Sequence, residues 1–299
     1  MLTIRTLSVP VGDPKPALSA AEHALEYALS PQAFTRKTDP GPERANSMWL
    51  GSNEALRSLG VERGAETRAK QLTSALLGRH TVTGAQARPP HFTQPSGAGT
   101  RPSLGGPGRF ERQMAVTSFV LDFWAPGSMS WVWAQSDAKL RASLGQAMVQ
   151  AAGQAIEYLT RTRPLVAGIE PARGFAASIA LHVISRKPPW LEPPPPQLHV
   201  HCYLVGVLDA NMKLRTPHSE ALYGESVMRE CGAAGRAVLA EELRKLRFPI
   251  EALTGPGRRF FEIAGVPPEL AASSSAWEHA ECQESTRTHP AEHHRHSHN

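Results

Sequence analysis

Residues 197–205 form an apolar run that carries two histidines, His199 and His201, and this run constrains the fold more than any other segment. Side chains of a β-strand alternate between its two faces, so both histidines project to one side. The intervening and flanking Leu, Val and Cys side chains project to the other side. This pattern predicts a buried strand that presents two imidazoles, which is half of a metal site.

A second strand-like run, residues 175–186, carries His182 near its end. The segment between the two runs, residues 187–196, contains six prolines and cannot lie in the interior of a sheet. If the two strands pair antiparallel across this loop, His182 falls beside His199 and His201. Three histidines with an open coordination position are typical of a catalytic metal site. The alternative, core histidines that donate to backbone carbonyls, stays open.

The composition bounds the class of protein. The 299 residues fit one large domain or two small ones. Three dispersed cysteines and the lack of an apolar leader or membrane-length apolar run predict a reduced, cytoplasmic chain with no membrane partner. The net charge of +5 is uneven, because residues 34–112 contain twelve Lys or Arg against six Asp or Glu. This segment suits a polyanionic partner such as nucleic acid.

Hydrophobic periodicity predicts an α+β fold, with a central antiparallel β-sheet covered by helices. We expect a strand at residues 116–123 and helices at residues 20–30 (capped by Ser19), 66–77, 138–160 and 226–246. Residues 87–108 are rich in Pro, Gly and Ser, which predicts a long mobile loop. Residues 1–271 are expected to form the domain. Residues 272–299, which hold six of the thirteen histidines, are expected to be a disordered tail.

The order of motifs along the chain resembles the relaxase domain of the TrwC-type (MobF) conjugative relaxases, members of the HUH endonuclease superfamily. The resemblance is carried by residues 1–4, 48–56, 123–133, 182–186, 197–201 and 261–267. These include a Trp-x-Gly segment at Trp49, an Ala-Pro motif at Ala125 that resembles a strand of the family, and the histidine signature. The ordered set spans most of the chain.

The resemblance implies site-specific nicking of one DNA strand at a transfer origin, through a phosphotyrosine link to the 5′ end. Tyr27, the one tyrosine before Trp49, is the candidate nucleophile. A divalent ion, Mg²⁺ or Mn²⁺ with Zn²⁺ as the alternative, would be held by His182, His199 and His201. Partners implied by the family are single-stranded or hairpin DNA at the transfer origin, a separate helicase and a coupling protein.

The chain departs from the family at several positions. Val120 stands where the family has an aspartate that orients a metal-binding histidine, and Asp122, two residues later on the same face, is the candidate replacement or else a strand-end residue in water. Gly127 replaces a lysine, and the loop between His182 and His199 is longer by six residues. The basic residues expected to contact DNA phosphates are Arg36, Lys37, Arg186 and Lys187.

Two other functions remain open from the sequence. A catalytically degenerate relaxase-fold protein would bind single-stranded DNA without nicking it, as the departures at Gly127 and around Tyr27 allow. A metal-dependent hydrolase of a small substrate would need the three histidines alone, but it leaves the Ala-Pro motif and residues 261–267 unexplained.

Overall fold

The computed structural model describes residues 2–10, 15, 17–19, 21–22, 47–89, 91–92, 114–166, 169–184, 196–218, 220–222, 225–253 and 261–274. Their centre is an antiparallel sheet with the strand order β1-β4-β6-β5-β2; β3 joins it beside β4, and β7 beside β6. The strands are β1 (Leu2–Pro10), β2 (Ser47–Gly51), β3 (His91–Phe92), β4 (Met114–Trp124), β5 (Gly174–Ile184), β6 (Pro196–Leu208) and β7 (Leu214–Arg215). The predicted α+β class with a central antiparallel sheet is confirmed.

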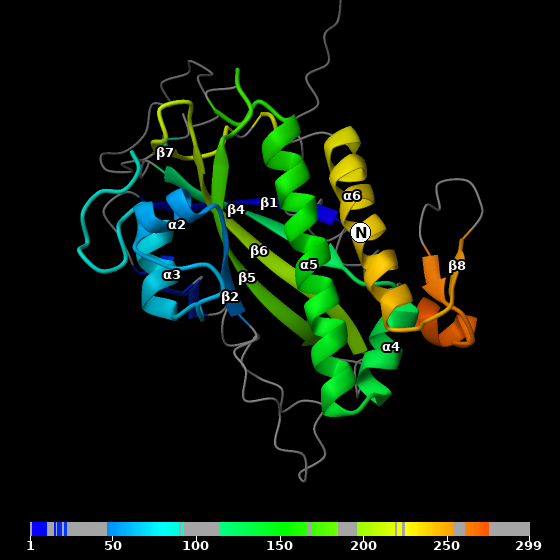
Figure 1. Cartoon of the computed structure of the whole chain (residues 1–299). Helices are drawn as coiled ribbons and strands as arrows, with labels where there is room; N and C mark the ends of the chain where they lie inside the picture. Colours follow the sequence, from blue (N-terminus) through cyan, green and yellow to red (C-terminus); the bar gives the residue numbers. More distant parts are fainter. Residues whose placement is uncertain are drawn as a thin grey trace, which may run out of the picture.

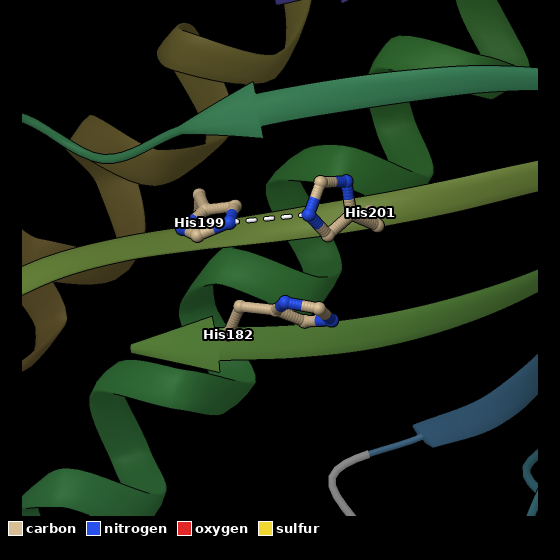
Figure 2. Close-up of side chains that lie close together, drawn as sticks. All are labelled: His182, His199 and His201. Atoms are coloured by element: carbon tan, nitrogen blue, oxygen red, sulfur yellow. Dashed lines mark hydrogen bonds between the residues drawn. The ribbon is translucent and has the colours of Figure 1, made fainter. Parts of the chain in front are cut away.

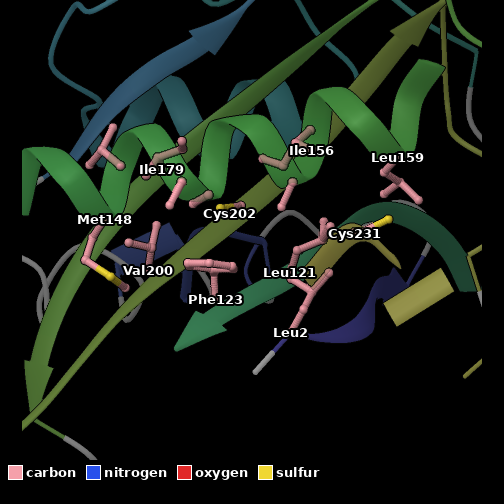
Figure 3. Packing of buried hydrophobic residues seen from close by; sticks show 14 of the residues in the cluster. Leu2, Leu121, Phe123, Met148, Ile156, Leu159, Ile179, Val200, Cys202 and Cys231 are labelled. Atoms are coloured by element: carbon pink, nitrogen blue, oxygen red, sulfur yellow. The ribbon is translucent and has the colours of Figure 1, made fainter. Parts of the chain in front are cut away.

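Two long helices, α5 (Ala138–Thr162) and α6 (Glu225–Lys245), cover one face of this sheet (Figure 1). The Asp137 side chain caps α5 by accepting a hydrogen bond from the Leu140 amide at 2.8 Å. Figure 3 shows the core under α5, where Met148, Ile156 and Leu159 lie with Phe123, Val200 and Cys202 of the sheet. The apolar residues that alternate with the histidines of β6 therefore point into this core, as the sequence predicted.

A smaller core lies on the opposite face, under α2 (Asn53–Leu59) and α3 (Ala69–Leu76). Trp49 is fully buried there, and Val120 and Tyr203 reach it from the sheet. Gly51 lets β2 approach β5, because a Cβ at this position would lie 2.0 Å from the Phe175 carbonyl oxygen. The Trp-x-Gly motif thus anchors β2 on the sheet by one buried ring and one close backbone approach.

The remaining elements are α4 (Gly127–Gln135), between β4 and α5, and a two-stranded sheet of β8 (Ile250–Ala252) and β9 (Phe261–Ile263) after α6. Helical residues 268–274 follow β9. None of the described helices is both long enough and apolar enough to span a membrane.

Two sequence predictions need correction. The strand expected at residues 116–123 is β4, which ends at Trp124, but the Ala-Pro motif that the resemblance matches to a strand of the family leads into a helix, α4. Pro126 precedes this helix, and a distant side chain described below caps its first turn. The first helix includes Lys15 and residues 17–19, so it begins before Ser19, which is not its cap. Most of the predicted mobile loop and almost all of the predicted tail lie outside the described residues.

Candidate metal centre

Three imidazoles meet at the ends of β5 and β6, on the face opposite α5. His182 and His199 are direct partners in the antiparallel pairing of the two strands, and His201 lies two residues further on the same face as His199. One ring nitrogen from each of the three histidines lies within 4.8 Å of the others. Figure 2 shows the His199 and His201 rings beside each other on β6, with the His182 ring next to them on β5. The pairing predicted from the sequence is confirmed.

The ring of His199 is fixed from two sides. Its Nδ1 atom lies 3.0 Å from the Gln197 carbonyl oxygen, to which it donates. Trp124, the cross-strand partner of His199 on β4, stacks on the ring with centroids 4.2 Å apart and an interplanar angle of 18°. Burial, together with the neighbouring His201, lowers the pKa of His199 to about 3. His199 is therefore neutral at physiological pH, which is the form that binds metal.

The ring of His201 is held by Asp122, its direct partner on β4. The His201 Nδ1 atom donates to Oδ1 of Asp122, which is 3% exposed. Oδ2 of Asp122 accepts from Nη2 of Arg5 at 2.8 Å and from Nε of Arg5 at 3.0 Å. It also accepts from the Thr3 hydroxyl at 3.3 Å. Burial raises the pKa of Asp122, but His201 and Arg5 outweigh it and leave the pKa well below its usual value. Asp122 is thus a buried anion, and not a strand-end residue in water.

These hydrogen bonds decide whether the site fits a metal ion. His199 is neutral and donates from Nδ1, so its Nε2 atom carries a lone pair, which faces Nε2 of His201 at 3.2 Å. A cation between these two nitrogens, or one proton shared by them, satisfies this contact. Two nitrogens bound to one zinc ion at about 2.0–2.1 Å in tetrahedral geometry lie about 3.4 Å apart. The donor set therefore fits a divalent metal ion.

The structure brings together four of the residues singled out from the sequence: His182, His199, His201 and Asp122. Val120, at the position where the resemblance expects aspartate, lies in the smaller core and is 6% exposed. The remaining candidates lie outside the described residues: Tyr27, Arg36, Lys37, Arg186 and Lys187.

Sequence reasoning missed four groups at the site: Thr3, Arg5, Trp124 and the Gln197 carbonyl. Trp124 could have been found, because strand alternation places it on the face of Asp122. Thr3 and Arg5 also alternate, but their register against β4 has no local signal in the sequence.

The position of the expected lysine, Gly127, has a structural explanation. A Cβ at Gly127 would lie 2.0 Å from the Ala271 carbonyl oxygen, so no side chain fits while residues 268–274 are packed there. The departure from the family at Gly127 is therefore coupled to the close approach of a later segment of the chain.

Comparison with known proteins agrees with this architecture. The conjugative relaxase TrwC in complex with oriT DNA is similar in a metal-bound form (21% identity, TM-score 0.59) and a copper-bound form (20%, 0.60). TrwC complexed with a 27-mer DNA comprising the recognition hairpin and the cleavage site is similar at 19% identity and a TM-score of 0.58. Each comparison covers 96% of this chain and 84% of the other chain, and at these identities it shows the fold.

No curated protein matches the chain in sequence. The family model described as TrwC relaxase matches residues 24–299, which include all three histidines, Asp122 and Gln197. Since this match spans most of the sequence, the chain belongs to the TrwC relaxase family.

Proposed function

We propose that the protein nicks one DNA strand at a transfer origin and transfers it, with a divalent metal ion held by His182, His199 and His201. The observation that carries the proposal is the approach of the Nε2 atoms of His199 and His201 to 3.2 Å, with a ring nitrogen of His182 within 4.8 Å of them, in a member of a relaxase family. Three imidazole donors favour Zn²⁺ over Mg²⁺, and Mn²⁺ is the third candidate. When bound, the ion would polarise a non-bridging oxygen of the scissile phosphate.

The chain's own residues would prepare the site before DNA arrives. Asp122 and the Gln197 carbonyl hold two rings in the tautomer that presents Nε2, and Trp124 restricts the His199 ring by stacking. Because His199 and Asp122 are buried, these rings need little reorganisation when a ligand binds. This arrangement supports catalysis through a fixed metal position.

We further propose Tyr27 as the nucleophile. Its oxygen would bond to phosphorus as the bond from phosphorus to the 3′ oxygen breaks, leaving a 3′ hydroxyl and a phosphotyrosine. Ala17 and Ala21 are fully buried in the core that also contains Val120 and Tyr203, on the sheet face that carries the histidines. Tyr27 follows the last described helical residue, Glu22, closely enough to lie within about 18 Å of it. The described helical residues before Tyr27 pack on the face that carries the histidines, and this supports the choice of Tyr27.

The two tyrosines of the described part, Tyr158 and Tyr203, are poorer candidates for the nucleophile. Tyr203 lies on the histidine face, but burial raises its pKa and disfavours its phenolate. Tyr158 lies on α5, on the opposite side of the sheet, and donates to Glu230 at 3.2 Å. Tyr158 is thus the matched control for Tyr27.

The test is formation of a covalent adduct. The full-length protein with Mn²⁺ or Zn²⁺ is incubated with single-stranded oligonucleotides that tile the transfer-origin DNA, and we expect an adduct that survives SDS. Tyr27→Phe should abolish this adduct, whereas Tyr158→Phe should retain it. No adduct from folded, metal-loaded protein with any such strand would overturn nicking. Salt-sensitive binding of the same strands without an adduct would identify the catalytically degenerate DNA-binding protein.

Several finer assignments belong to the same proposal. Arg36, Lys37, Arg186 and Lys187 would contact DNA phosphates; Arg186 and Lys187 come soon after β5, which ends at Ile184, in the sequence. Replacing one phosphate-contacting residue by Ala should lower the salt dependence of binding by about one unit of log–log slope. The relaxase domain, predicted as residues 1–271, would extend at least to Ser274, which is buried and bonded to Pro196 and Gln197. It would act in the cytoplasm with a helicase and a coupling protein.

A further inference from the structure

Residues 261–274, which we call the C-terminal clamp, form hydrogen bonds with the first turn of α4. Pro126, the residue before α4, offers no side-chain cap. Instead, Oε2 of Glu262 accepts from the Ser128 amide at 2.8 Å, and the Ile263 amide donates to the Ser128 hydroxyl at 2.7 Å. This reciprocal pair resembles a capping box supplied by a distant segment. The clamp therefore fixes the first turn of α4.

The same clamp reaches the start of β6, immediately before the histidines. The Ser274 hydroxyl donates to the Pro196 carbonyl at 2.7 Å, and Nε2 of Gln197 donates to the Ser274 carbonyl at 3.2 Å. Ser274 is 3% exposed and Gln197 is 4% exposed. From the other side, the Ser130 hydroxyl of α4 accepts from the Leu198 amide at 3.0 Å. Residues 196–198 are thus held between the clamp and α4.

A β-bulge explains why these contacts matter. The register of β5 and β6 shifts, so that His182 pairs with His199 but Ile184 pairs with Pro196. Gln197 and Leu198 together oppose one residue of β5, and a bulge of this kind disrupts the ladder locally. The Gln197 carbonyl accepts from the His199 ring at 3.0 Å. The group that orients His199 is therefore positioned by the clamp as well as by the sheet.

We propose that Ser274 and Gln197 are positioning residues that set metal affinity by holding the Gln197 carbonyl on Nδ1 of His199. This inference rests on the proposed metal site, and it extends that site to the C-terminal clamp. Without the clamp contacts, residues 196–198 relax, and His199 also populates the tautomer with its proton on Nε2. That tautomer presents no lone pair at Nε2 and cannot bind the ion there.

Two substitutions remove the contacts independently. Ser274→Ala removes the hydroxyl on Pro196 and keeps the backbone carbonyl. Gln197→Met removes the amide on Ser274; it also removes Oε1 of Gln197, which is buried and has no hydrogen-bond partner among the described residues, so the stability cost should be small. Ser273→Ala is the matched control, because the Ser273 hydroxyl donates to the Leu270 carbonyl within the clamp at 2.7 Å.

The first measurement uses the metal-free, full-length protein labelled with ¹⁵N-histidine. Two-bond ¹H–¹⁵N correlation spectra report the tautomer of each ring, and His199→Gln identifies the His199 signals. We expect the Nδ1–H form for the wild type and Ser273→Ala. Ser274→Ala and Gln197→Met should show a mixture of tautomers, and Ser274→Thr, which keeps the hydroxyl, should restore the Nδ1–H form.

The second measurement is Zn²⁺ calorimetry on full-length protein in which the six histidines between His279 and His298 are replaced by Gln. Ser274→Ala and Gln197→Met should each weaken binding by about tenfold, the lower end of the range for groups that orient metal ligands. Wild-type affinity and tautomer in the folded double variant would overturn the positioning role alone. Absence of Zn²⁺ binding in the parent protein would overturn the proposed metal site itself.

Discussion

Asp122 and His201 are directly opposed on β4 and β6, and the carboxylate of the first accepts the Nδ1 proton of the second. Thr3 opposes Asp122 on β1, so one row of side chains crosses three strands. A neighbouring row contains Trp124, His199 and His182 on β4, β6 and β5. The positions of the three imidazoles therefore depend on how four strands, β1, β4, β6 and β5, pair with one another. Each pairing can be tested by replacing the residue that it places at the site.

Asp122→Asn should weaken Zn²⁺ binding by about 10- to 100-fold, because an amide holds the His201 ring less firmly than a carboxylate does. Calorimetry in the background without tail histidines measures this. Asp209→Asn is the control: Asp209 is also buried and paired with an arginine, Arg215 at 2.8 Å, but at the other end of β6. Equal affinities of the two variants would show that Asp122 does not support a metal ligand.

His201→Ala should weaken Zn²⁺ binding by more than about 100-fold, because it removes a ligand. Removing a group that only orients a ligand weakens binding by up to about 100-fold. The fold should remain, since Val200 and Cys202 on the opposite face of β6 supply the core contacts. Calorimetry and circular dichroism measure the two effects. His80→Ala is the control, because Nδ1 of His80 accepts from the Val82 and Thr83 amides in a loop that supplies no ligand of the site, and it should leave the affinity unchanged. Wild-type affinity after His201→Ala would mean that the histidines are structural.

The metal-free protein should lose stability on mild acidification. The pKa of His199 is about 3 in the folded state, below the ordinary value of 6.5, so between these values the unfolded state binds more protons and stability falls as pH falls. From pH 7.5 to 5 this should lower the free energy of unfolding by about 2 kcal/mol. The contribution of the Asp122 anion is lost only at lower pH. Urea unfolding measures the slope, and His199→Gln should flatten it; an unchanged slope would contradict the assignment.

Gly127→Ala should destabilise the protein by about 1–3 kcal/mol, the usual cost of overpacking, because the new Cβ meets the Ala271 carbonyl. Gly232→Ala on α6 is the control: its Cβ would meet only the end of the Arg236 side chain within 3 Å, so it should be neutral or stabilising. Urea unfolding compares the two. If Gly127→Ala were as stable as Gly232→Ala, the clamp would not be packed against α4.

The histidine cluster could be predicted from the sequence because its causes are local. Alternation puts His199 and His201 on one face, and a hairpin across a proline-rich loop brings His182 beside them. The support of Asp122 could not be predicted, because Arg5 lies 117 residues away and no local pattern sets the register of β1. The helical state of α4 was missed for the same reason. Its Trp-Val-Trp sequence favours strand, but Glu262, 134 residues from Ser128, caps a helix there.

The separation between Thr3 and Asp122, 119 residues, also has a consequence for how the protein acquires its metal. Closing a short hairpin costs less chain entropy than joining distant strands, so we expect β5 and β6 to pair before β1 docks on β4. Until β1 arrives, Asp122 lacks its arginine and cannot be a stable buried anion. Only molecules in which β1 has docked on β4 would then retain the ion tightly. The metal content of a preparation would report the fraction of molecules that have completed this step of folding.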